Sequence, residues 1–376
     1  MSHFDEVIER SGTLSSRWEG RGETLALTVG DSDFRLPPAV KRAIEARLEE
    51  GVLGYDSVPD SLCELIAARL QLFYGWKIEP EWLVFLPGVV QGLNLCCRGL
   101  AAADEQVLVE TPVYYPFLDA PGNAGRQMQT FSARRTEGRW QFDLDAFTDL
   151  AARPESRLLL FCNPQNPLGR VSRRQELERL AEVCLRENIV LVSDEIHCDV
   201  LYDQKQHVPV ASLNPEVAEV SVTLMGPSKT YAISGLGGAF AIIPGATLRD
   251  RFNAAAAGLV PNLHALAIAA LAAVYGECDD WYAEEKAYLQ ENRDLAVAQL
   301  RRVAGLELFE PEGTYFLWLD FSGTGLNDPY NTLLEAGVEL SEGGKFGDAA
   351  CLRLNFASSR EVLSEALNRI TGKLCP

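Results

Sequence analysis

The chain carries, at residues 220–231, the run Val220-Ser221-Val222-Thr223-Leu224-Met225-Gly226-Pro227-Ser228-Lys229-Thr230-Tyr231. Its first half is rich in β-branched and other apolar residues, which predicts a buried strand. Gly226-Pro227 ends the strand with a turn, and Lys229 follows at once. Because an α/β sheet binds its ligands outside the carboxyl ends of its strands, this lysine stands where a ligand would lie.

Two earlier strand ends carry polar residues in the same way. Ser193-Asp194-Glu195-Ile196-His197 closes the apolar run 189–193, and Asn163-Pro164-Gln165-Asn166-Pro167-Leu168-Gly169 follows the run 157–162. Taken singly, such residues are commonly helix caps, turns or solvated side chains. Since the carboxyl ends of parallel strands meet at one edge of a sheet, we expect Lys229, Asp194 and Asn166 to share a site.

A lysine, an aspartate and an asparagine at three such junctions can hold pyridoxal phosphate (PLP). The lysine amine would form a Schiff base with the cofactor aldehyde, and the aspartate would keep the ring nitrogen protonated. Pro87-Gly88-Val89-Val90 also closes an apolar run and opens a helix, so its free amides suit a phosphate. The sequence therefore predicts an enzyme that uses this cofactor.

Strands and helices alternate from about residue 38 to residue 243, which predicts an α/β domain with a mostly parallel sheet and helices on both faces. The expected strands are 82–86, 106–110, 157–162, 189–193, 220–225 and 238–243, and the expected helices are 38–50, 61–74, 90–100 and 173–187.

The pattern changes near residue 279. A long charged helix (281–304) precedes strand-like runs (306–309, 315–320 and 351–355) and a final helix near 360–373. We therefore expect a large domain over residues 42–275 and a smaller α+β domain over residues 276–376, completed by residues 1–41.

Composition excludes several classes of partner. The net charge is −19 with no Lys/Arg run, so we expect neither nucleic acid nor an anionic membrane as a partner. The amino terminus lacks the pattern of a signal peptide, and no apolar run approaches the ~18 residues of a membrane span. Nine cysteines without paired spacing predict a reducing cytoplasm, and four histidines at no ligand spacing predict no metal site.

The motifs together resemble those of fold-type I PLP enzymes of the class I/II aminotransferase superfamily, over nearly the whole chain. Within it, the chain is most similar to the cystathionine β-lyase-like C–S lyases of the MalY/PatB type, chiefly through Asp194-Glu195-Ile196-His197 and the Gly88-Val89-Val90 turn. The other motifs that carry the resemblance are Gly30-Asp31-Ser32-Asp33-Phe34, Gly54-Tyr55, Pro112-Val113-Tyr114-Tyr115-Pro116-Phe117, residues 163–170, Pro227-Ser228-Lys229-Thr230, residues 315–321, Gly344-Lys345-Phe346-Gly347 and Arg353-Leu354-Asn355.

The resemblance implies an aspartate aminotransferase-like fold with a mostly parallel seven-stranded sheet, and a role for each motif residue. Lys229 would hold PLP and move the substrate α-proton as general base, and Asp194 would pair with the ring nitrogen. Arg353 would bind the α-carboxylate of a small amino-acid substrate. The remaining expected cofactor contacts are Asn166 and His197 at the ring oxygen, Tyr114 stacked on the ring, and Val89, Val90 and Ser228 at the phosphate.

Tyr55 is expected, on the same resemblance, to reach the phosphate of the other subunit, which makes the protein an obligate homodimer. Some positions depart from the family. Many aminotransferases of this group carry a phosphate-binding arginine where Gly237 stands, and the lyase branch also lacks it. Ala232 replaces a common asparagine. Ser32, Leu168 and residues 355–359 also differ from the branch, which leaves the substrate open.

Three functions remain open at this point. The first is β-elimination on an S-substituted cysteine such as cystathionine, cystine or a cysteine conjugate, which yields a thiol, pyruvate and ammonia. The second is transamination of an amino acid on the same fold, since both reactions begin with loss of the α-proton. The third is a regulatory protein without turnover, against which the presence of Lys229, Asp194 and Asn166 argues.

Overall fold

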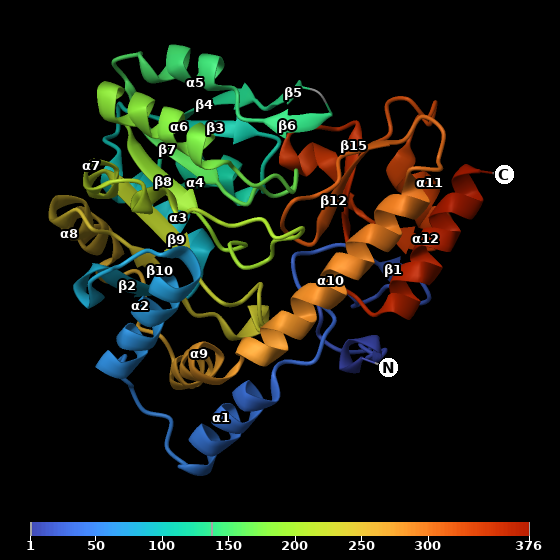
Figure 1. The fold of residues 1–376 in the computed structure, drawn as a ribbon, viewed down its shortest axis with the longest axis horizontal. Coiled ribbons are helices and arrows are strands. Elements are labelled where there is room, and N and C mark those ends of the chain that lie inside the picture. Colours follow the sequence, from blue (N-terminus) through green and yellow to red (C-terminus); the bar gives the residue numbers. More distant parts are fainter. Residues whose placement is uncertain (1, 137, 376) are drawn as a thin grey trace.

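The computed structural model describes residues 2–136 and 138–375, built around a seven-stranded sheet (Figure 1). The strands lie in the order β2-β10-β9-β8-β7-β3-β4. Their bounds are Leu83–Leu86 (β2), Ala239–Ile242 (β10), Ser221–Met225 (β9), Val190–Asp194 (β8), Ser156–Cys162 (β7), Gln106–Thr111 (β3) and Gln127–Ser132 (β4).

The sheet is mostly parallel, as the alternation of strands and helices predicts. Strand β10 is the exception, since it runs antiparallel to both β9 and β2. A parallel neighbour needs a long crossover connection, whereas the short segment that carries Lys229 returns the chain beside β9. The functional segment 226–238 is thus the turn between two adjacent strands.

Helices cover both faces of the sheet, and successive side chains of one strand reach different faces. Val190 and Val192 of β8 pack in one cluster with Leu93 of α3, whereas Leu191 packs in another with Leu177 of α6. This burial on both sides explains why the strand is a continuous apolar run. The helices of this part are α1 (Pro38–Glu49), α2 (Asp60–Tyr74), α3 (Val89–Leu100), α4 (Pro116–Asn123), α5 (Leu144–Ala151), α6 (Arg174–Glu187), α7 (Pro215–Glu219), α8 (Ala246–Ala256) and α9 (Ala265–Glu277).

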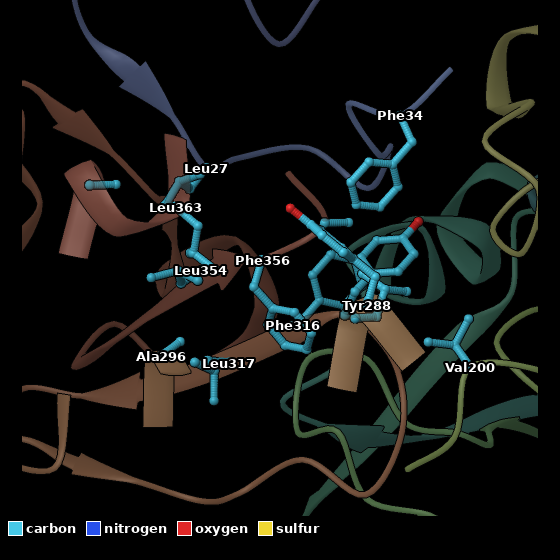
Figure 2. Packing of buried hydrophobic residues seen from close by; sticks show 14 of the residues in the cluster. Leu27, Phe34, Val200, Tyr288, Ala296, Phe316, Leu317, Leu354, Phe356 and Leu363 are labelled. Atoms are coloured by element: carbon cyan, nitrogen blue, oxygen red, sulfur yellow. The ribbon is translucent and has the colours of Figure 1, made fainter. Parts of the chain in front are cut away.

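A second, four-stranded sheet has the order β11-β12-β15-β14. Its core joins distant parts of the chain: Leu27 and Phe34 pack in one cluster with Leu317, Leu354 and Leu363 (Figure 2). The elements here are β11 (Glu307–Leu308), β12 (Phe316–Asp320), β14 (Ser341–Glu342), β15 (Cys351–Asn355), α10 (Asp279–Leu300), α11 (Pro329–Glu335) and α12 (Arg360–Leu374).

The amino-terminal segment joins this second part through β1 (Leu25–Ala26), which pairs in parallel with β13 (Val338–Glu339). The boundaries at residues 41 and 275 between two domains stay a prediction. Over the described ranges, no helix is long and apolar enough to cross a membrane.

The structure adds elements that the sequence pattern does not single out. Helices α4, α5, α8 and α9 and strand β4 are among them, as is a small hairpin of β5 (Arg134–Thr136) and β6 (Arg139–Gln141). Strand β4 is an edge strand whose side chains are mostly exposed or half-buried, so its polar sequence lacks the apolar pattern of the inner strands.

Candidate active site

A cavity of about 1040 Å³ lies at the carboxyl ends of β2, β7, β8 and β9, beside the second sheet. It gathers residues from segments far apart in the sequence, at the edge of the sheet where a ligand is expected to bind. Nine of the ten predicted site residues line it: Val89, Val90, Tyr114, Asn166, Asp194, His197, Ser228, Lys229 and Arg353.

Lys229 lies four residues past Met225, the last residue of β9. Its Nζ donates a hydrogen bond to the carbonyl oxygen of Gly30 at 2.7 Å and a longer one to the hydroxyl of Ser234 at 3.4 Å. Burial lowers the pKa of the Lys229 amine to about 8, because the charged form loses water. A lysine with this pKa has a substantial neutral fraction near pH 7–8, which suits both a nucleophile and a base.

Asp194 is the last residue of β8, and one of its carboxylate oxygens accepts the amide of Ile196 at 3.0 Å. Burial raises the pKa of this carboxyl to about 7, and the charge of Lys229 opposes the shift. A buried carboxylate is stabilised by a cationic hydrogen-bond donor. A protonated pyridine nitrogen is such a donor, so the residue fits the ring end of PLP.

Arg353 projects from β15 and contacts Asn166 from the opposite side of the site. Its Nη1 donates to Oδ1 of Asn166 at 3.0 Å, and its Nη2 donates to the carbonyl of Val29 at 3.2 Å. The guanidinium lies over the ring of Phe316 at 4.0 Å, and burial lowers its pKa to about 10. Within residues 2–136 and 138–375, no carboxylate pairs with this buried guanidinium, so it is suited to bind a substrate carboxylate.

The turn before α3 forms the other end of the cavity. The helix begins after Gly88 without a side-chain cap, so the amides of Val89 and Val90 are free for an anion, and Ser228 lies on the same wall. Gly237 packs against this turn: a Cβ at this residue would lie 2.9 Å from the carbonyl oxygen of Pro87. Close backbone packing therefore explains why no arginine occupies position 237.

The structure places the other predicted residues in three different settings. His197 is buried with its ring edge-on to Tyr315 and Phe316, and burial lowers its pKa, so the imidazole is neutral. Tyr114 is joined to Asn166 through a backbone hydrogen bond of 2.9 Å, and burial raises the pKa of its phenol. Tyr55 is fully exposed and lies outside the cavity, so its contact with a partner subunit stays a prediction.

Sequence reasoning missed three contacts of the cavity. Gly30 contributes a carbonyl to Lys229, Ser234 contributes a hydroxyl, and Phe316 lies under Arg353. Ser234 could have been suspected from its position five residues past Lys229 in a glycine-rich stretch. Gly30 and Phe316 lie in motifs that carry the family resemblance, but their contacts with Lys229 and Arg353 could not be predicted, because each reaches the site from a distant segment.

Ala232 lines the cavity with a φ of 54°, in the left-handed region. Asparagine tolerates this region better than alanine does. We expect Ala232→Asn to raise the free energy of unfolding by about 0.5–1 kcal/mol in denaturant titrations. The control is Ala254→Asn, in the exposed part of helix α8, which should lower the free energy of unfolding. A loss of stability in both variants would contradict the backbone argument.

Comparison with known proteins agrees with this geometry. Residues 23–370 match the family described as aminotransferase class I and II. Cystathionine beta-lyase PatB of Bacillus subtilis is 34% identical, over 99% of this chain and 100% of the relative. The crystal structure of OvoB is 40% identical with a TM-score of 0.96 and covers 99% of each chain. The PLP-bound C-S lyase of Staphylococcus hominis is 29% identical with a TM-score of 0.94, over 100% of this chain and 99% of that one.

The family match extends across both sheets, and it includes the strand ends that supply Asn166, Asp194, Lys229 and Arg353. The chain belongs to the aminotransferase class I and II family.

Proposed function

We propose that this protein is a PLP-dependent C–S lyase that cleaves an S-substituted cysteine to a thiol, pyruvate and ammonia. The observation that carries the proposal is the meeting of Lys229, Asp194 and Arg353 in one cavity. The half-buried amine of Lys229 would match the aldehyde, the buried carboxylate of Asp194 the ring nitrogen, and the buried guanidinium of Arg353 the substrate carboxylate. The similarity to relatives named as cystathionine β-lyase and C–S lyase supports the choice of reaction.

The residues present fit PLP along its whole length. Lys229 would hold the cofactor through its amine, and Asp194 would pair with the ring nitrogen. The side-chain nitrogen of Asn166 would donate to the ring oxygen while its Oδ1 accepts Arg353. Tyr114 and His197 would contact the ring, and Val89, Val90 and Ser228 would hold the phosphate at the start of α3.

When bound, PLP supplies an electron sink for the electron pair left on the substrate α-carbon. Arg353 holds the α-carboxylate with its guanidinium and so fixes the amino acid relative to Lys229. Lys229 removes the proton from the α-carbon, which its pKa of about 8 permits near neutral pH. The electron pair at the α-carbon then forms a double bond to the β-carbon as the C–S bond breaks, and the electrons of that bond leave with the thiolate. Water hydrolyses the released enamine to pyruvate and ammonia.

The protein acts, in this proposal, as a homodimer in the cytoplasm on a small amino-acid substrate. Exposed apolar side chains gather around the segment of Tyr55, which supports a contact with a second copy. They are Val52, Leu53 and Tyr55, and residues 53–56 border a hollow with residues 261–266. The hydroxyl of Tyr55 would reach the phosphate of the partner's cofactor.

Turnover without an amino-group acceptor separates the candidate reactions. We expect the protein loaded with PLP to form pyruvate and free thiol from cystathionine or cystine with no keto acid added. Pyruvate is measured with a coupled dehydrogenase, and thiol is measured with a chromogenic disulfide. Conversion that occurs only when an α-keto acid is present would instead establish an aminotransferase. No conversion in either assay would favour a protein without turnover.

A further inference from the structure

The two cationic side chains of the site, Lys229 and Arg353, both donate hydrogen bonds to one backbone loop, residues 28–31. The carbonyl oxygen of Gly30 accepts Lys229 Nζ at 2.7 Å and also the hydroxyl of Tyr315 at 2.8 Å. The neighbouring carbonyl of Val29 accepts Nη2 of Arg353 at 3.2 Å. The position of this loop therefore sets the direction of the amine and the guanidinium at the same time.

The loop does not adopt this shape through local preference. Val29 has a φ of 49°, which a β-branched residue rarely adopts. Such a conformation persists only where the surrounding structure holds it. Two buried side chains, those of Asn355 and Arg17, hold the loop in this conformation.

Asn355 is fully buried and supplies most of that support. Its side-chain amide donates to three carbonyls of the loop, those of Thr28 at 3.3 Å, Val29 at 3.1 Å and Asp31 at 2.7 Å. Its Oδ1 accepts the amide of Ala357 at 2.8 Å, which fixes the orientation of the side chain. Asn355 follows Arg353 by two residues on β15, so the strand that supplies the guanidinium also supports the loop beneath it.

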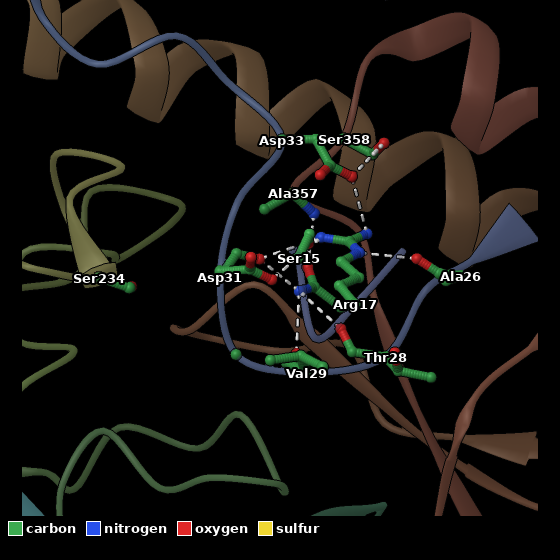
Figure 3. Close-up of polar contacts among 12 residues, drawn as sticks. Ser15, Arg17, Ala26, Thr28, Val29, Asp31, Asp33, Ser234, Ala357 and Ser358 are labelled. Carbon is green, nitrogen blue, oxygen red and sulfur yellow. Dashed lines mark hydrogen bonds and ion pairs between the residues drawn. The ribbon is translucent and has the colours of Figure 1, made fainter. Parts of the chain in front are cut away.

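Arg17 also supports the loop, through the same carbonyl of Asp31 that Asn355 contacts. It is fully buried, and it donates to the carbonyl of Asp31 at 3.1 Å and to that of Ala26 at 2.7 Å. Figure 3 shows its guanidinium enclosed between Ala26 and Asp33, beside Val29 and Asp31. The loop is thus held by two side chains, those of Asn355 and Arg17, that take no part in the proposed reaction.

We propose that Asn355 is a positioning residue, which orients Lys229 and Arg353 through the carbonyls of loop 28–31. The proposal rests on the proposed function insofar as it treats these two residues as catalytic and substrate-binding groups. Burial lowers the pKa of the Lys229 amine, and the charge of Arg353 lowers it further. The charges of Asp31 and Asp194 raise it. Because Asp31 belongs to the loop, a loosened loop that moves this carboxylate away from the amine should lower the pKa of Lys229.

Asn355→Ala tests the proposal, with Asn292→Ala as the matched control. Asn292 is also fully buried and also donates to two backbone carbonyls, those of Phe356 at 3.0 Å and Ser358 at 2.8 Å, but it does not contact the loop. The two variants lose the same kind of hydrogen bond, so they share any general loss of stability. Asn355→Ser, which loses the reach to the loop carbonyls, replaces the alanine variant if that variant does not fold.

Two measurements decide the outcome. The first is the pH dependence of acylation of Lys229 in the cofactor-free protein by an amine-reactive ester, followed by peptide mass spectrometry. We expect its midpoint to fall by about one pH unit in Asn355→Ala and to stay unchanged in Asn292→Ala. The second is steady-state kinetics, in which KM should rise about tenfold in Asn355→Ala with a smaller change in kcat.

Equal midpoints and equal KM values in the two variants would overturn the positioning role. The acylation measurement needs neither cofactor nor turnover. A wild-type protein without lyase activity would therefore refute the proposed function while leaving this result readable.

Discussion

Lys229→Ala is expected to reduce kcat/KM for β-elimination by at least about 10³-fold and to remove the visible absorbance that the protein gains with PLP. The side chain supplies two functions in the proposed reaction, the covalent hold on the cofactor and the base at the α-carbon. Both depend on one amine, whose pKa burial lowers to about 8. No other lysine reaches that position in the described part of the cavity, since Lys41, the second lysine that lines it, forms an ion pair with Glu45 on α1.

Lys205→Ala is the control for this experiment. Lys205 pairs with Glu312 away from the cavity, so its loss should leave turnover and the absorbance unchanged. Pyruvate release measures activity, and a visible spectrum of the dialysed protein measures bound cofactor. A folded Lys229→Ala variant with wild-type activity would refute the assignment of the active site.

The fold could be predicted in large part, because its inner strands are buried on both faces. Residues such as those of β8 form continuous apolar runs, and the helices that follow carry apolar faces at helical spacing. Strand β4 could not be recognised, since an edge strand with exposed side chains has no such run. The antiparallel direction of β10 follows from its short connection to β9. This direction was not predicted from the sequence.

The site, like the fold, could be predicted from the sequence only in part. Asn166, Asp194 and Lys229 could be predicted together, because each follows an apolar strand and parallel strands end at one edge. The contact between Asn166 and Arg353, 187 residues apart, depends on how the second sheet lies against the first. The hydrogen bond from Lys229 to Gly30 depends on the same placement. No local pattern encodes such contacts, so they had to come from the structure.

Asp194→Asn is expected to lower kcat by about 10²–10³-fold and to weaken cofactor binding. The amide has the shape of the carboxylate but no charge, so it does not keep the ring nitrogen protonated, and the electron sink is lost. Glu216→Gln, at the exposed start of α7, is the control and should leave both quantities unchanged. An Asp194→Asn variant with wild-type kcat would show that the reaction does not need a protonated ring.

The same substitution should stabilise the cofactor-free protein at high pH. Burial raises the pKa of Asp194 from 3.8 in the unfolded chain to about 7, so the folded protein binds more protons than the unfolded chain between these values. The free energy of unfolding of the wild type therefore falls as the pH rises from about 4 to 7, by on the order of 2–4 kcal/mol from this residue. Asp194→Asn lacks this pH dependence. In denaturant titrations, the free energy of unfolding of the variant should therefore rise relative to that of the wild type between pH 5 and pH 8.

Adding PLP should make the wild type the more stable protein at pH 8, because only the wild type then pairs its buried carboxylate with a cation. Parallel pH profiles of the two cofactor-free proteins would contradict the burial argument and with it the electrostatic fit to the ring.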